Sequence, residues 1–357
     1  MEELHDLNTM LQLMPQPAFR VENGIISHVN QAAATYLLQP GQSFDSMILH
    51  GADEYKEFTS GKLYLRISLG STACDACISK LECGDIVTFQ QASDSSQLQA
   101  LALAAHALKE PLNGLISATA QILPEVAMEG TQQEHTASQI NRRLYQMLRI
   151  INNMSDASAY TQVSPRLTET VEMGIFLKEI LDKTAVLAGK ADIALSYCLP
   201  NQQIFTLADR ERLERAIYNL LSNAMKFADP GTTIQVKLTQ KNKRIALSVT
   251  NDQKTPSVQG NLFHRYLREP LWEDPRNGLG LGMLMICSTA AIHGGTVLVD
   301  TVDHSTRITI TLQQKTSAAD QVRSPIHHFD YAGELDHCLL ELADVLPPCV
   351  YHPDQLN

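Results

Sequence analysis

His106 is the first residue in the chain that could carry phosphoryl-transfer chemistry. It directly follows Ala105, which belongs to an apolar stripe. A neutral imidazole is a competent nucleophile, and a place at the edge of such a stripe would leave it accessible. Pro111 lacks a backbone donor, so we expect the helix to bend just past the histidine. The alternative is a surface histidine on a coiled helix.

A second stretch, Asn219–Phe227, reads NLLSNAMKF. On a helix Asn219 and Asn223 share a face, and Lys226 lies three residues further on. Amide oxygens suit a Mg²⁺ ion that also binds phosphates, and a lysine supplies a point charge for phosphate. Phe227 could cover a base. The alternative is a polar helix face that binds nothing.

A third stretch alternates glycine with leucine just before a predicted helix at 282–293, and comprises Gly278, Leu279, Gly280, Leu281 and Gly282. Glycines let backbone amides approach phosphate, and the helix dipole favours the anion. A lone glycine-rich turn is a weak signal. Its place some fifty residues after the asparagine stretch strengthens it; the alternative is a flexible connection.

An α/β sandwich over 163–313 would position the second and third stretches. Helices are predicted near 175–187, 210–227 and 282–293, and strands near 193–197, 234–238, 245–250, 296–299 and 307–312. These elements bring distant parts of the chain into one domain.

The histidine lies in a region, 93–162, whose apolar residues recur at alternating intervals of three and four. The two series are Leu98, Leu101, Ala105, Leu108, Leu112, Leu115 and Ala137, Ile140, Leu144, Met147, Ile151, Met154, with Pro124 and Gly130 between them. Such heptads predict two helices in an antiparallel hairpin. A lone hairpin covers its stripes poorly, so we expect a homodimer joined as a four-helix bundle.

The two ends of the chain have other patterns. Residues 11–92 indicate a small α+β unit, with a hairpin turn at Asn23-Gly24 and a helix capped by Asn30. The tail, 314–357, should form one amphipathic helix, because leucines recur at 335, 339, 342 and 346. The roles of this tail and of Cys74, Cys77 and Cys83 are left open, with structural thiols favoured over a metal site.

The overall composition excludes some classes of function. With 28 basic and 39 acidic residues the net charge is −11, which disfavours nucleic acid as a partner. No apolar run of about 18 residues exists, so no membrane span is expected. The N-terminus is acidic, unlike a signal peptide, and a cytoplasmic location with reduced cysteines is predicted.

In combination, these stretches resemble the sensor histidine kinases of two-component systems. Asn219–Phe227 looks like the N-box and Gly278–Gly282 like the glycine-rich box of the GHKL (Bergerat) ATPase fold. His106–Leu112 resembles the phosphoacceptor H-box, and Leu262–Tyr266 the phenylalanine box of the ATP lid. Residues 17–90 are similar to a PAS sensor domain. The resemblance implies a multidomain α+β protein: a PAS-like α/β sensor (1–92), a helical-hairpin dimerisation domain (93–162), an α/β ATPase sandwich (163–313) and a tail (314–357).

This resemblance also implies roles for single residues. Asn223 would hold Mg²⁺ with Asn219 beside it, Lys226 would meet phosphate, and Phe227 would pack near adenine. The amides of 278–282 would bind the triphosphate of ATP. His106 would accept the γ-phosphoryl group and pass it to an aspartate on the receiver domain of a response regulator.

Two departures from the family pattern support a second reading. Ala107 replaces the acidic residue that usually follows the phosphoacceptor, and Glu110 is a possible substitute base. Asn251 falls where the family has an aspartate that binds adenine, and Gln253 and Thr255 replace glycines. The leading hypothesis is an ATP-dependent protein-histidine kinase; the alternative is a catalytically impaired dimeric scaffold or regulator of two-component signalling.

Overall fold

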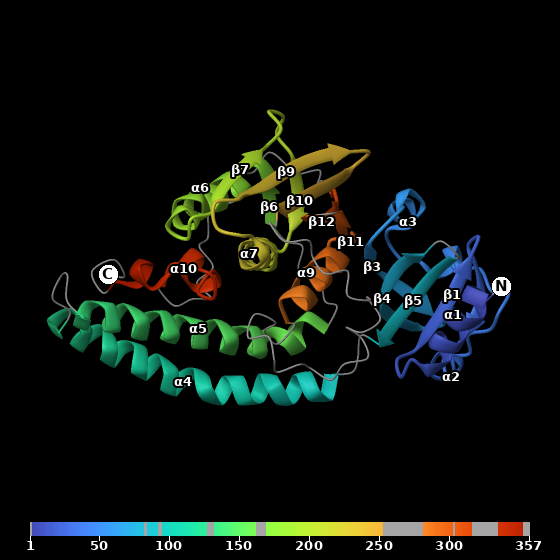
Figure 1. The fold of residues 1–357 in the computed structure, drawn as a ribbon, viewed down its shortest axis with the longest axis horizontal. Coiled ribbons are helices and arrows are strands. Elements are labelled where there is room, and N and C mark those ends of the chain that lie inside the picture. Colours follow the sequence, from blue (N-terminus) through green and yellow to red (C-terminus); the bar gives the residue numbers. More distant parts are fainter. Residues whose placement is uncertain are drawn as a thin grey trace.

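The computed structural model describes residues 2–81, 84–91, 95–126, 132–161, 169–252, 281–302, 304–315 and 335–352. Figure 1 shows a small sheet-containing unit at the N-terminal end, two long helices along one side, and an α/β layer above those helices. Among the described residues, no helix is both long and apolar enough to cross a bilayer.

The N-terminal unit is an antiparallel five-stranded arrangement in the order β2-β1-β5-β4-β3. Its core is aromatic, with Phe19 packed edge-on against Phe44 and Phe44 against Tyr55. Its elements are α1 (Glu2–Leu13), β1 (Ala18–Glu22), β2 (Ile25–Val29), α2 (Gln31–Ala34), η1 (Asp45–Met47), α3 (Ala52–Glu57), β3 (Lys62–Leu69), β4 (Thr72–Leu81) and β5 (Gly84–Gln91).

Two local predictions for this unit are confirmed. Asn23 and Gly24 both have positive φ, 51° and 76°, and join β1 to β2 as a hairpin. The Asn30 side chain accepts a hydrogen bond from the Ala33 amide and so caps α2. Cys74 and Cys77 are buried on β4, and Cys83 lies outside the described residues. Helix α1 was not predicted.

Helices α4 (Ser95–Val126) and α5 (Gln132–Thr161) lie side by side and antiparallel (Figure 1). Pro124, predicted to interrupt the first helix, lies inside α4. A proline removes one backbone bond and can bend a helix without ending it. The heptad residues divide by exposure: Ala105, Leu112, Ala137 and Ile151 are buried, whereas Leu108, Leu115, Ile140 and Met147 are exposed.

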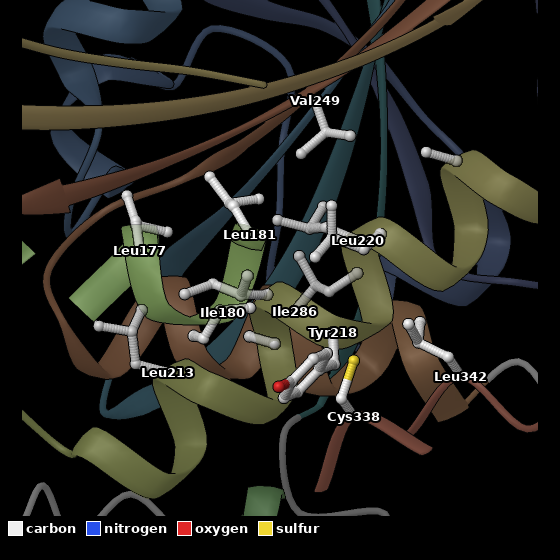
Figure 2. Packing of buried hydrophobic residues seen from close by; sticks show 14 of the residues in the cluster. Leu177, Ile180, Leu181, Leu213, Tyr218, Leu220, Val249, Ile286, Cys338 and Leu342 are labelled. Atoms are coloured by element: carbon white, nitrogen blue, oxygen red, sulfur yellow. The ribbon is translucent and has the colours of Figure 1, made fainter. Parts of the chain in front are cut away.

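The α/β layer contains a sheet in the order β11-β12-β10-β9-β7, covered by α6, α7 and α9. Figure 2 shows leucines of α6 and α7 meeting Val249 of β10 in the core. The elements are β6 (Glu169–Glu172), α6 (Met173–Lys190), β7 (Ala194–Cys198), β8 (Phe205–Ala208), α7 (Arg210–Phe227), β9 (Thr233–Lys241), β10 (Arg244–Asp252), α9 (Leu281–Ile292), β11 (Val297–Val302) and β12 (Ser305–Gln313). The pair β6–β8 was not predicted; α7 has the predicted bounds.

The two sheets are continuous, which the sequence did not indicate. Strand β3 of the N-terminal unit pairs antiparallel with β11, with Leu63 opposite Leu298, and so completes a ten-stranded sheet. Gly61 permits this approach, because a Cβ there would lie 2.2 Å from the carbonyl oxygen of Val299. The Arg244 guanidinium lies 3.4 Å from the Glu54 carboxylate across the same junction.

We expect Gly61→Ala to separate β3 from β11. Gly70→Ala is the matched control, because Gly70 also has positive φ (63°, against 83° at Gly61) but a Cβ there meets nothing within 4 Å. Both variants carry the left-handed backbone strain of alanine, and only the first adds a clash with the backbone. Hydrogen exchange of the amides at 297–299 should rise at least about tenfold in Gly61→Ala alone. Equal rates in the two variants would contradict this role for Gly61.

The C-terminal segment, defined here as residues 335–352, holds α10 (His337–Glu341) and η3 (Pro348–Tyr351). One amphipathic helix through the leucines at 335, 339, 342 and 346 was predicted; the structure corrects its extent, because α10 covers only 337–341, a little over one turn. Asp336 caps its start, and the carbonyls of Ala343 and Asp344 accept bonds from α5 side chains beyond its end. Leu340, Leu342 and Leu346 are fully buried.

Candidate nucleotide and phosphoacceptor sites

Helix α7 presents the asparagine stretch. Asp209 caps it by accepting a hydrogen bond from the Arg212 amide at 3.1 Å. Its apolar side, including Ile217 and Leu221, is buried against the sheet layer, which fixes the rotation of the helix. Asn219 therefore lies toward both neighbouring helices, since it contacts Met285 of α9 and Arg149 of α5.

Asn219 is buried at 3% exposure and fully engaged within the protein. Its Nδ2 donates to the carbonyl oxygen of Arg215 at 2.8 Å, and its Oδ1 accepts from Nη2 of Arg149 at 3.4 Å. A Cβ at Gly282 would lie 2.8 Å from that same Oδ1. The start of α9 thus reaches α7 at the asparagine, and glycine at 282 allows the approach.

Asn223, one turn beyond Asn219, is partly exposed, as is Lys226. The Lys226 ammonium lies 5.8 Å from the centroid of the Phe227 ring, and Phe227 is 37% exposed. An accessible amide, a cation and an aromatic face therefore adjoin each other at the C-terminal end of α7. This combination can bind a phosphate-bearing ligand with a planar base.

Asn251 lies on β10 opposite Thr306 and is 4% exposed. Its Nδ2 is buried and has no hydrogen-bond acceptor among the residues that the structure describes. A buried donor without an acceptor costs about 1–3 kcal/mol, which a bound ligand could recover. Of the predicted site residues beyond β10, Leu281 and Gly282 begin α9. Residues 278–280, the lid box at 262–266, Gln253 and Thr255 lie outside the described residues.

His293, at the end of α9, helps to fix α7. Its Nδ1 lies 2.7 Å from the Thr289 carbonyl oxygen, and its Nε2 lies 3.1 Å from the Asp209 amide. Burial lowers the pKa of the imidazole below its ordinary value. The neutral ring donates from Nδ1 and accepts at Nε2, so it links the cap of α7 to the end of α9.

His106 is exposed on α4, whereas the preceding Ala105 and, further along the same helix, Leu112 are buried. Ala107 and Glu110 are exposed as well. Figure 1 shows α5 between α4 and the α/β layer, so the histidine and the asparagine stretch are on helices that another helix separates. The imidazole is thus accessible to solvent, and the asparagine stretch is not on the neighbouring helix.

Sequence reasoning missed the charged residues that surround Asn219. Glu341 is 1% exposed, and its carboxylate lies 3.2 Å from Nε of Arg215 and 3.4 Å from Nε of Arg149. Arg215 also pairs with Asp156 of α5. These residues come from α5, α7 and α10, and no local spacing in the sequence links them.

Most of the α/β layer matches a known protein family. Residues 208–316 match the family model described as histidine kinase-, DNA gyrase B-, and HSP90-like ATPase. The chain is 26% identical over 199 residues to the sensor protein KdpD of Clostridium acetobutylicum. This alignment covers 54% of this chain and 22% of KdpD. It is 25% identical over 230 residues to the sensor histidine kinase YcbM of Bacillus subtilis, covering 63% of this chain and 74% of YcbM.

The solved structure of full-length ShkA in complex with AMPPNP aligns with a TM-score of 0.48 and 20% identity, over 62% of this chain and 47% of ShkA. The chain spans less than a quarter of the length of KdpD. The family model and the two sequence relatives show that the protein contains an ATPase domain of the histidine kinase-, DNA gyrase B- and HSP90-like type and is related in sequence to sensor histidine kinases.

Proposed function

We propose that the protein is a sensor histidine kinase that binds ATP with Mg²⁺ between α7, β10 and the start of α9 and phosphorylates His106. The observation that carries the proposal is the approach of Gly282 to Asn219, because it brings the asparagine stretch and the end of the glycine-rich stretch together. The family match over 208–316 and the buried Nδ2 of Asn251 support the same pocket.

Each site residue has a defined task in this proposal. The Asn223 amide oxygen holds Mg²⁺, which neutralises phosphate charge when bound, and Lys226 binds phosphate. Asn251 can pair with the adenine edge, since its oxygen accepts from the amino group and its nitrogen donates to a ring nitrogen. Phe227 covers the base. The amides of Gly278, Gly280 and Gly282, with Leu279 and Leu281 between them, bind the triphosphate.

His106 carries out the transfer. Its neutral imidazole nitrogen attacks the γ-phosphorus, the bond to the bridging oxygen breaks, and ADP leaves with that electron pair. The proton of the ring passes to solvent or to Glu110, one turn along. The phosphohistidine then donates the phosphoryl group to an aspartate of a response-regulator receiver domain.

A homodimer through α4 and α5 fits the exposed apolar residues. Leu108 and Leu115 of α4 are 52% and 55% exposed, and Met147 of α5 is 48% exposed. Their heptad spacing forms a stripe that a second copy of the same hairpin could cover. We propose a PAS-like sensory role for the N-terminal unit, which is joined to the ATPase layer through β3 and β11.

Labelling with γ-³²P-ATP and Mg²⁺ tests the proposed function. We expect an acid-labile label on the wild-type protein and its complete loss in His106→Gln, because the accepting nitrogen is gone. The matched control is His135→Gln, since His135 is an exposed histidine on the other helix of the pair. Label that persists in His106→Gln would refute His106 as the acceptor. No label in the wild type, with ATP still bound, would favour the impaired scaffold.

A further inference from the structure

The C-terminal segment lies between α5 and the α/β layer, and Figure 1 shows α10 next to both α5 and α7. On the ATPase side, Cys338 Sγ is 3.6 Å from the Thr184 hydroxyl of α6. His337 lies 3.3 Å from Glu214 of α7. Tyr218 of α7 lies beside Cys338 (Figure 2). The apolar side of this segment is therefore part of the ATPase core.

On its other side, the segment follows α5 for several turns. The Asn141 amide donates to the carbonyl oxygen of Tyr351 at 3.1 Å, and Gln146 donates to the carbonyl oxygen of Ala343 at the same distance. The rings of Tyr145 and Tyr351 pack edge to face with centroids 5.2 Å apart. Side chains of α5 thus bind backbone carbonyls of the segment, which is a specific attachment and not loose apolar contact.

One carboxylate connects the C-terminal segment to both α5 and α7. Glu341 of the segment pairs with Arg149 of α5 and Arg215 of α7 while almost fully buried. Asp344 of the segment is a second carboxylate on the same arginine, with its Oδ2 2.6 Å from Nη1 of Arg149. Arg149, held in this way, donates to Asn219 of the proposed nucleotide pocket.

We propose that the C-terminal segment is an autoinhibitory clamp. It holds α5 against the Asn219 side of α7, so that the ATPase domain is docked on the helix pair with α5 between its pocket and α4. His106 on α4 cannot meet the bound nucleotide of the same chain until the clamp opens. The inhibitory role rests on the proposed kinase function, whereas the clamp itself rests on the contacts.

Tyr351→Ala tests the clamp in the full-length protein, because Tyr351 contacts α5 twice. Its ring packs on Tyr145, and its backbone carbonyl oxygen accepts from the Asn141 side chain. Asn141→Ala is the second variant, which weakens the same contact from the α5 side and leaves the apolar core intact. Cys349→Ser is the matched control, since Cys349 is exposed in the same segment. Hydrogen exchange is measured at the α5 amides 141–149 and at α7, with His106 labelling by ATP in parallel.

We expect both variants to raise exchange at 141–149 at least about fivefold with α7 unchanged, and to speed His106 labelling several-fold, while Cys349→Ser matches the wild type. Unchanged exchange at α5 in Asn141→Ala and Tyr351→Ala would overturn the clamp. Faster exchange with equal or slower labelling would overturn the inhibitory role. Faster exchange with no label in any protein, wild type included, would support the clamp and refute the kinase function on which inhibition depends.

Discussion

Glu341→Ala should lower the free energy of unfolding by about 3–5 kcal/mol, the cost of removing one partner from a buried ion pair. Its carboxylate faces Arg149 and Arg215, whose side chains are 6% and 2% exposed. Each arginine keeps a second acidic partner, Asp344 or Asp156, but both of those are substantially exposed. Water screens the remaining pairs, so they cannot replace the lost buried charge.

Asp344→Ala is the matched control for this prediction, because it removes a carboxylate from the same Arg149. Since the Asp344 side chain is 46% exposed, its loss should cost only about 0–1 kcal/mol. Denaturant unfolding followed by circular dichroism compares the two variants with the wild type. Equal losses in both would show that burial of Glu341 does not govern the stability of this network.

The features that could be predicted from the sequence are local or periodic. The bounds of α7, the Asn23-Gly24 turn and the Asn30 cap each depend on residues a few positions apart, whose spacing sets the backbone. The β3–β11 pairing and the Glu341 network join residues more than a hundred positions apart. No periodicity records such contacts, because they depend on how whole elements pack.

The asparagine stretch shows the same limit within the site. Helical spacing correctly places Asn219 and Asn223 one turn apart, but it does not show that their surroundings differ. Asn219 is buried and bonded to Arg149 and to the backbone of α7, whereas Asn223 remains partly exposed. The accessible amide is therefore Asn223, and Asn219 fixes the position of α9 next to it through Gly282.

Replacing Asn223 with alanine should therefore abolish the Mg²⁺-dependent part of ATP binding. Altering groups that only support a metal ligand typically costs 10–100-fold in affinity, so loss of the ligand itself should weaken binding at least about 100-fold. That factor corresponds to about 2.7 kcal/mol. Isothermal titration with ATP, in Mg²⁺ and in EDTA, measures the effect, and the variant should show the same weak affinity in both.

Asn201→Ala is the matched control, because Asn201 is exposed in the bend between β7 and β8 and its loss should leave binding unchanged. Asn223 is only partly buried on a helix where alanine is well tolerated, so the variant should keep the wild-type stability. An affinity loss in Asn223→Ala would thus report on the ligand site and not on the fold. Wild-type affinity with full Mg²⁺ dependence in that variant would place the metal on other residues, and would remove the chemical basis for the proposed pocket.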